Sequence, residues 1–201
     1  MIRTLALIVR RPDVSRREFR DHYEEIHAPL ALPFMTGLQH YLRNHVAEAL
    51  SGPEPGFDVM TEFGYARAED VEHIVGILES PDGEPIRRDE LTFMDTQRNT
   101  FFAVGDPVRV VGGESVPDAA VKVAALVKTA GEGAFEPLLA AGPLRAVTHE
   151  VLGGPHGESP WDQVAFLWYA PDALEDERLR GWEPDATRAA LLRVEPCQTR
   201  L

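Results

Sequence analysis

Short runs of apolar residues recur along the first hundred positions with the length and composition of β-strands. Residues 4–9 form a mainly apolar run, which is typical of a strand buried on both faces. Gly37 opens a second strand that extends to about Val46, and a third begins at Phe57, after a loop rich in glycine and proline. A fourth strand is predicted over residues 97–104. The pattern therefore predicts four strands in this part of the chain.

Between these strands the apolar positions follow a helical period. Ser15 precedes a charged periodic stretch and predicts the N-cap of a helix over residues 16–28, which Pro29 and Pro33 then disrupt. Residues 69–78 place their apolar side chains on one stripe, and residues 85–94 form a further helical stretch. The predicted order is strand, helix, strand, strand, helix, strand.

The chain looks like a tandem repeat. Residues 57–66 read FDVMTEFGYA and residues 161–170 read WDQVAFLWYA, and the two segments align without a gap. Three further pairs of segments align in the same order along the chain. Residues 2–10 align with 121–129, residues 37–46 with 142–151, and residues 95–105 with 185–195. Matched segments in one order indicate that a half-domain was duplicated and fused. The second copy has lost most of the helix that the first copy carries between its first two strands.

The repeat sets the predicted domain organisation. The first copy covers residues 1–111, a linker covers residues 112–118, and a degenerate second copy covers residues 119–201. The βαββαβ order is the ferredoxin-like plan, whose sheet has helices on one face. In single-repeat proteins a second chain covers the open face, and the two sheets close into a barrel. We therefore expect an α+β fold of the dimeric α+β barrel type, with two fused repeats forming an intramolecular pseudodimer.

The composition of the chain limits the classes of binding partner and the cellular location that we expect for the protein. The net charge of −13 opposes binding to nucleic acid and to anionic membranes, which select for Lys and Arg patches. The single cysteine, Cys197, makes no internal disulfide, and the apolar run at residues 5–9 is too short for a signal-peptide core or a membrane span. We expect a cytoplasmic protein that binds a small molecule, and the pattern leaves room for a further homodimer.

The sequence predicts neither a metal nor an organic cofactor. A zinc helix carries two histidines four positions apart, whereas His22 and His27 are five apart and are expected to point away from each other. Cys197 stands alone, and His40 and His45 are expected on opposite faces of a strand. The chain also lacks a dinucleotide fingerprint.

Polar side chains on the second and third predicted strands are candidates for chemistry. Asp58 and Glu62 are expected on one face of the third strand, where a carboxylate pair is costly to bury without charged or hydrogen-bonding partners. Tyr41, Arg43 and His45 share one face of the second strand and are the expected partners.

The two copies help to separate structural from functional residues. Asp58 is matched by Asp162, which favours a structural role, whereas Glu62 is replaced by Phe166, which favours a functional one. The three polar residues of the second strand are likewise not retained in the second copy. His27 fits either a general base or a capping or core histidine.

Four segments of the first half, REFRDHYEEIHAPLA (17–31), GLQHYLRNHV (37–46), FDVMTEFGYARAEDVE (57–72) and FFAVGD (101–106), carry a recognisable pattern. With them the first half resembles an EthD domain of the dimeric α+β barrel superfamily. The second half is a weaker copy without the His-Ala-Pro-Leu helix. The resemblance extends to Tyr23, where the family often has Trp, and to His27, Tyr41, Asp58 and Glu62. The resemblance implies a pocket for a small carbonyl or phenolic compound. It does not single out one reaction, because one fold can carry several chemistries.

These features favour a cofactor-independent cyclase or dehydratase, a lyase that acts on an aromatic or polyketide-like carbonyl intermediate in secondary metabolism or aromatic breakdown. Such chemistry needs a base of near-neutral pKa and a donor to the enolate oxygen. We expect His27 to be the base, with Tyr41, Tyr23 or Arg43 as the donor and Glu62 orienting an imidazole or acting as a second base.

Two alternatives stay open, a cofactor-free monooxygenase on a phenolic substrate and a non-catalytic binding protein. The expected catalytic residues are His27, Tyr41 and Glu62, and the expected substrate-binding residues are Tyr23, Arg43, His45, Asp58, Phe63 and Phe101.

Overall fold

The computed structural model describes residues 1–113, 115–128, 133–154 and 159–201, which form two compact units. Unit 1 comprises Met1–His45, Gly56–Phe101 and Cys197–Leu201, and unit 2 comprises Val46–Pro55 and Phe102–Pro196. Each unit thus contains segments from both sequence copies, so the unit boundaries do not coincide with the predicted linker. Residue 114 of that linker and residue 129 of the matched segments lie outside the described residues.

The strands of unit 1 form an antiparallel arrangement. They are β1 (Ile2–Ile8), the first part of β2 (Leu38–Ser51), β3 (Val59–Tyr65) and the start of β4 (Thr100–Val104). β3 lies between β1 and β2 and pairs with both, with Glu62 opposite Leu5 on one side and Thr61 opposite Arg43 on the other. The apolar runs of the sequence therefore predicted β1 and the start of β3 to within two residues, whereas β2 extends to Ser51, beyond its predicted end at about Val46.

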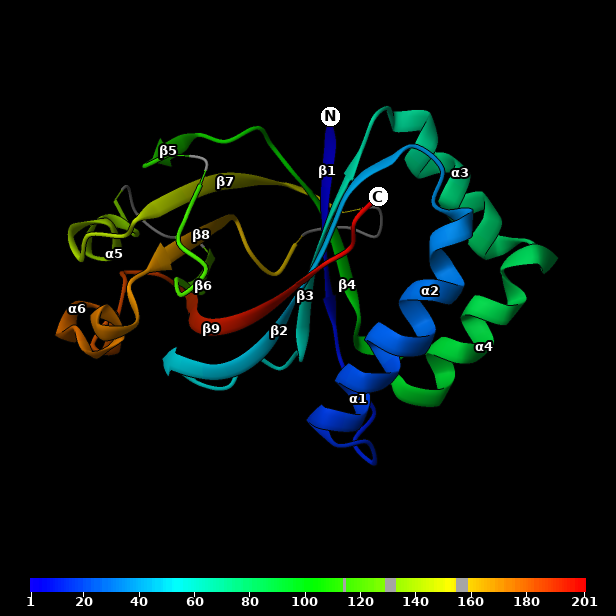
Figure 1. The fold of residues 1–201 in the computed structure, drawn as a ribbon, viewed down its shortest axis with the longest axis horizontal. Helices are drawn as coiled ribbons and strands as arrows, with labels where there is room; N and C mark the ends of the chain where they lie inside the picture. The colour runs from blue at the N-terminus through cyan, green and yellow to red at the C-terminus, as the bar shows by residue number, and fades with distance from the viewer. Residues whose placement is uncertain (114, 129–132, 155–158) are drawn as a thin grey trace. The chain divides into compact units, whose positions relative to one another are not determined.

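Helical segments cover one side of these strands, as Figure 1 shows, with α1 and α2 running beside α4. The segments are α1 (Arg16–His22), the π-helix η1 (Tyr23–His27), α2 (Ala28–Ala31) and η2 (Leu32–Phe34), then α3 (Ala68–Glu79), η3 (Pro81–Gly83), α4 (Glu84–Phe93) and η4 (Thr96–Arg98). The predicted helices at residues 69–78 and 85–94 correspond to α3 and α4.

The first helix begins where the sequence predicted and then changes its winding. The expected disruption at Pro29 is wrong, because helical backbone continues past it through α2 and η2 to Phe34. Ser15 is the N-cap, and with Glu18 it forms a capping box in which each side chain bonds the other residue's backbone N–H. From Tyr23 the helix widens, and the backbone N–H of Ala28 bonds the carbonyl of Tyr23, five residues earlier. Such π-segments are rare and occur often at functional sites.

The core of unit 1 lies between the helices and one face of the strands. It contains Ala6, Ile8, Phe19, Tyr23, Val59, Phe93 and Met94. Complete burial of an aromatic or large aliphatic side chain stabilises a fold by about 1.5–3 kcal/mol. This packing fixes α1 and η1 against the sheet and α4 against both.

Unit 2 repeats the strand plan with smaller helices. Its elements are the end of β2, β5 (Arg109–Val111), β6 (Val121–Lys128), α5 (Glu136–Ala140), β7 (Arg145–Gly153), β8 (Gln163–Tyr169), η5 (Pro171–Glu175), α6 (Glu177–Arg180) and β9 (Arg188–Gln198) up to Pro196. β8 pairs antiparallel with β6 and β7, and β6 also pairs with β9. The short strand β5, which pairs with β7, was not predicted.

The pairing registers confirm the duplication. Leu5 faces Glu62 in the first copy, and the matched residues Ala124 and Phe166 face each other in the second. The same agreement holds between β2–β3 and β7–β8, where Arg43 opposite Thr61 corresponds to Thr148 opposite Ala165. Because a slip of one residue would invert every side chain, this agreement fixes the alignment of the two copies.

The predicted fold class, a ferredoxin-like α+β protein of the dimeric α+β barrel type with two fused repeats, is therefore confirmed. In the described part of the chain, no helix combines the length and apolar character needed to cross a membrane.

Candidate active site

Two histidines of the first helix share one carboxylate. His22 Nε2 lies 2.7 Å from Oδ1 of Asp89, and His27 Nδ1 lies 2.9 Å from Oδ2 of the same residue. The expectation that His22 and His27 point away from each other is therefore wrong. It assumed 3.6 residues per turn, whereas the wider π-turn of η1 brings residues five apart onto one face.

The position of His27 suits a neutral imidazole. The residue is 5% exposed, and burial lowers its pKa below the ordinary value even though Asp89 acts in the opposite direction. With Asp89 accepting the Nδ1 proton, the lone pair is at Nε2. Within the described residues Nε2 has no hydrogen-bond partner. His27 therefore combines an oriented ring with a free basic nitrogen.

Aromatic rings fix the direction of both histidines. The Phe93 ring, at the end of α4, lies 4.4 Å from that of His22 and 5.3 Å from that of His27, measured between centroids. Tyr23 packs at 5.1 Å from the His27 ring, and its hydroxyl is 3.2 Å from Oγ1 of Thr61 on β3. The dyad formed by His27 and Asp89 is thus held between η1, α4 and the sheet.

Tyr41 presents a buried hydroxyl on the same face of the sheet as Thr61. The residue is 1% exposed, and its hydroxyl has no hydrogen-bond partner of ordinary geometry in the described part of the chain. Burial raises the pKa of Tyr41 well above its ordinary value, and the neighbouring Tyr23 acts in the same direction. Tyr41 therefore stays protonated at neutral pH and can donate a hydrogen bond.

Arg43 and His45 face Glu24 of η1. The Arg43 guanidinium contacts both oxygens of the carboxylate, and Arg43 Nη1 donates to Oγ1 of Thr199 at 2.5 Å. His45 Nε2 lies 2.6 Å from Glu24 Oε1. Burial raises the pKa of Glu24, but its contacts with His45 and Arg43 outweigh burial and hold the pKa below its ordinary value. Arg43 and His45 therefore already have an anionic partner.

Glu62 lies on the opposite face of β3. Its Oε1 accepts a hydrogen bond from Asn44 Nδ2 at 2.8 Å, and Oε2 is 3.7 Å from His40 Nε2. The expectation that Tyr41, Arg43 and His45 would compensate this carboxylate is wrong, because those three residues alternate with Asn44 along β2. The structure thus separates Glu62 from His27 and Tyr41.

Asp58 and its counterpart in the second copy have similar surroundings. Arg10 Nε lies 3.0 Å from Asp58 Oδ1, and the Asp58 N–H donates to the carbonyl of Ile8. In the second copy, Asp162 pairs with Lys128 at 2.7 Å, and its N–H donates to Val127. An aspartate that closes the same strand end in both copies fits the structural role suggested by the sequence.

The two remaining candidates differ in exposure. The Phe63 ring stacks between those of Tyr41 and Tyr65, at centroid distances of 5.1 and 6.2 Å. Phe101 is 48% exposed. Phe63 therefore belongs to the aromatic face beside Tyr41, whereas Phe101 lies at the surface.

Cys197 is not isolated in space, although it stands alone in the sequence. Glu24, His45 and Cys197 each offer one ligand atom within 4.8 Å of the others, so the three meet the distance requirement for a metal site. Arg43 contacts Glu24, and Arg20 Nη2 lies 3.7 Å from Cys197 Sγ. These guanidinium groups oppose a divalent cation at this position.

A surface hollow beside α4 includes one residue of the candidate site. It is lined by Glu84, Pro85, Arg88, Asp89 and Thr92, so it includes the carboxylate that binds both histidines. The His22 side chain is itself 25% exposed. The hollow and the dyad therefore share Asp89.

Sequence reasoning missed Asp89 and Glu24 as partners of the candidate residues. Asp89 lies 62 positions from His27, and their contact depends on how α4 packs against η1. A usable signal for Glu24 was its helical spacing, since Arg20 and Glu24 lie four residues apart on one face. The sequence held no comparable signal for Asp89.

Comparisons with known proteins agree with this fold. None of the curated proteins compared matches the sequence. An anthrone oxidase-like protein superposes with a TM-score of 0.59 at 12% identity, covering 98% of this chain and 92% of its own. A candidate monooxygenase from Lactobacillus acidophilus NCFM has a TM-score of 0.51 at 9% identity, covering 98% and 94%.

A candidate monooxygenase from Fusobacterium nucleatum subsp. nucleatum has a TM-score of 0.54 at 8% identity, covering 96% of this chain and 91% of its own. At such identities these structures establish the fold alone. The sequence match is more specific, because residues 11–97 fit the family model of the EthD domain. That range includes η1 with His27, the strand that carries Tyr41, and Asp89. The first copy of this chain therefore carries an EthD domain over residues 11–97.

Proposed function

We propose that this protein is a cofactor-independent enzyme that removes a proton from a carbon made acidic by the carbonyl of an aromatic or polyketide-like compound. The observation that supports this proposal best is the His27–Asp89 pair, in which a buried imidazole is oriented through Nδ1 and keeps Nε2 available. A carboxylate-oriented histidine is a common general base.

The charges of His27 and Asp89 suit the transfer of a proton from the substrate to the imidazole. Nε2 of neutral His27 takes the substrate proton, and the resulting imidazolium is stabilised by the negative charge of Asp89 at 2.9 Å. Burial keeps the ring neutral before the reaction, because it lowers the pKa of His27. A positioned base of this kind contributes about 10²–10⁴-fold to a rate.

Tyr41 is the proposed donor to the enolate oxygen. Its hydroxyl is buried beside Tyr23 and has no hydrogen-bond partner of ordinary geometry in the described part of the chain, whereas the Tyr23 hydroxyl has Thr61 and the Arg43 guanidinium has Glu24. A preorganised donor costs no reorganisation when charge develops on oxygen. Glu62 has no part in this mechanism, because it lies on the other face of β3.

The first candidate outcome is cyclisation or dehydration. The carbanion attacks a second carbonyl carbon of the same molecule, or the enolate expels a β-hydroxyl group, which leaves as water after protonation by His27. Both reactions return the proton to the substrate or to the leaving oxygen, so the protein is unchanged after turnover.

A second candidate, a cofactor-free monooxygenase, is favoured by the fold relatives described as anthrone oxidase-like or as candidate monooxygenases. The same deprotonation would give a carbanion that reduces O2. One oxygen atom would become a new carbonyl on the substrate, and the other would leave as water.

The test is turnover of aromatic ketones with acidic methylene groups: anthrone, which can be oxygenated but neither cyclised nor dehydrated, and aryl ketones with a β-hydroxyl group or a second carbonyl, which can undergo the lyase reactions. Oxygen uptake, product mass and Tm are measured together for the wild-type protein and for His27→Gln. Turnover without oxygen uptake supports the lyase, and stoichiometric uptake supports the monooxygenase. Equal rates for wild type and His27→Gln with any active probe would reject His27 as the base.

A further inference from the structure

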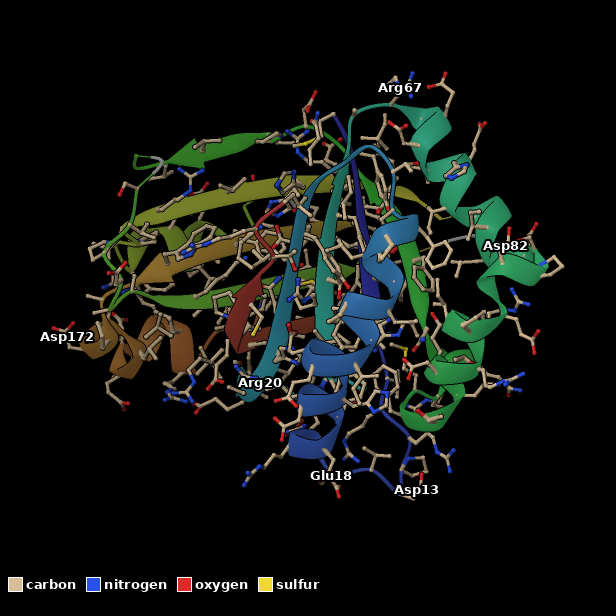
Figure 2. All side chains as sticks on the ribbon, turned by 45° about the vertical axis from the view of Figure 1, so that its right-hand side comes forward. Asp13, Glu18, Arg20, Arg67, Asp82 and Asp172 are labelled. Carbon is tan, nitrogen blue, oxygen red and sulfur yellow. The ribbon has the colours of Figure 1, made fainter. Side chains whose placement is uncertain are left out.

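A second polar cluster in unit 1 takes no part in this proton abstraction. It comprises Arg20 on α1, Glu24 on η1, His45 on β2 and Cys197 near the chain end. The Glu24–His45 hydrogen bond is 2.6 Å long, and Arg20 Nη2 lies 3.7 Å from Cys197 Sγ. Arg20 extends from the side of α1 nearest β2, while Glu18 lies near the start of the helix (Figure 2).

The positive charges around Cys197 favour a thiolate. Glu24 and a deprotonated Cys197 supply two negative charges, and Arg20, the neighbouring Arg43 and a protonated His45 supply three positive charges, so the charge of the thiolate is fully compensated. A divalent cation bound by Glu24, His45 and Cys197 would add two uncompensated positive charges. Because arginine stays protonated in proteins, the two guanidinium groups favour the anion over the cation.

We propose that Cys197 is a reactive thiolate and a modification site for small hydroperoxides, with His45, Glu24 and Arg20 as its supporting residues. The side chain of Cys197 is half-buried, so a small oxidant can reach it. Glu24 holds the imidazole of His45 in place, and Arg20 provides a positive charge directly at the sulfur.

The oxidation balances with hydrogen peroxide as the co-reactant. The thiolate attacks one peroxide oxygen, an S–O bond forms, and the O–O bond breaks. Sulfur is oxidised by two electrons to the sulfenic acid, and the peroxide is reduced. The leaving hydroxide takes a proton from the His45 imidazolium and departs as water.

The directions of the pKa shifts of Cys197 and His45 agree with a thiolate at Cys197. Contact with His45 holds the pKa of the Cys197 thiol below its ordinary value, although burial and the charge of Glu24 act in the opposite direction. Burial lowers the pKa of His45, but its contacts with Cys197 and Glu24 outweigh burial and raise the pKa above its ordinary value. The two shifts together favour a thiolate–imidazolium pair.

The test uses the full-length protein and its single cysteine. Alkylation rates with iodoacetamide are measured over a pH series, for the folded protein and for the protein unfolded in urea. The folded protein should show its midpoint at lower pH. One equivalent of hydrogen peroxide followed by dimedone should give one adduct per chain, and Cys197→Ser should give none.

Arg20→Gln is the decisive variant, because Arg20 is partly exposed and its loss leaves the His45–Glu24 pair in place. It should raise the alkylation midpoint, and His45→Asn should raise it further. Arg17→Gln is the matched control on the same helix, where the Arg17 side chain is 90% exposed, and it should leave the midpoint unchanged. A folded-state midpoint at or above that of the unfolded chain would overturn the proposal, as would stoichiometric zinc in the purified protein.

Discussion

At the scale of single residues, His27 shows how the chemistry of a side chain depends on its surroundings. In the sequence it fits a base or a core histidine equally well. In the structure it is buried and hydrogen-bonded to Asp89, and its second nitrogen remains available. The proposal of a base rests on that asymmetry between the two ring nitrogens.

His27→Gln should reduce turnover by about 10³-fold, because an amide has no basic nitrogen. The free energy of unfolding should fall by about 1 kcal/mol, since Asp89 keeps its contact with His22. Turnover and urea unfolding are measured on the same preparation. A variant with normal turnover and a loss of several kcal/mol would identify His27 as a structural residue.

The pH dependence of kcat/KM should report the same group. A base must be deprotonated to act, so the rate falls as the pH decreases through the pKa of His27 in the folded enzyme. Burial lowers that pKa, which places the midpoint of the acidic limb below about 6.5, the ordinary value for histidine. A midpoint above that value would mean that a different group is titrating.

Asp89→Asn should lower kcat by about 10²-fold or more, because a neutral amide neither fixes the Nδ1–H tautomer nor stabilises the imidazolium. Asp82→Asn is the matched control, since Figure 2 shows Asp82 at the turn between α3 and α4. Comparable losses in the two variants would show that the effect is general and electrostatic. Full activity of Asp89→Asn would remove the carboxylate from the mechanism.

At the scale of elements, the strands were more predictable than the first helix. β1 and β3 follow from runs of apolar and β-branched residues, and the Ser15 N-cap follows from its spacing to Glu18. The π-turn was not predictable from a 3.6-residue period, because its extra residue leaves no mark on the pattern of apolar positions. For this reason the prediction from the sequence placed His22 and His27 on different faces of the helix.

Deleting Ile26, which is 51% exposed, should leave the dyad intact. The shorter segment can wind as a regular α-helix, in which His22 and the former His27 stand four positions apart and still share a face. We expect Tm to be unchanged or higher and activity to be retained. Inserting an alanine after Ile26 is the contrasting change, because it places the histidines six positions apart and should abolish activity. The reverse order of activities would refute the role assigned to η1.

At the scale of the whole molecule, the sequence predicted the duplication and its register. It did not predict how the chain is shared between the compact units. Residues 197–201 belong to unit 1, where the Thr199 N–H donates to the carbonyl of Tyr41 at 3.1 Å and Arg43 donates to Oγ1 of Thr199. Such contacts link residues far apart in the chain, and local patterns carry no information about them.

Deleting residues 197–201 should lower the free energy of unfolding by about 1–3 kcal/mol, because it leaves the Tyr41 carbonyl and the Arg43 guanidinium without these partners. Deleting residues 200–201 alone, where Leu201 is 59% exposed, is the control and should have little effect. A fragment of residues 1–112 lacks the whole second copy, and we expect it to aggregate or to homodimerise through an exposed sheet face. Equal urea midpoints for the two deletions would contradict this account.

In the proposed mechanism His27 removes a proton from carbon. The most direct measurement is deuterium incorporation into anthrone in D2O without oxygen, followed by mass spectrometry, since it isolates proton abstraction from every later step. Wild-type protein should exchange the acidic methylene hydrogens faster than buffer alone, and His27→Gln should exchange them at the buffer rate. Exchange by His27→Gln at the wild-type rate would show that His27 is not the base.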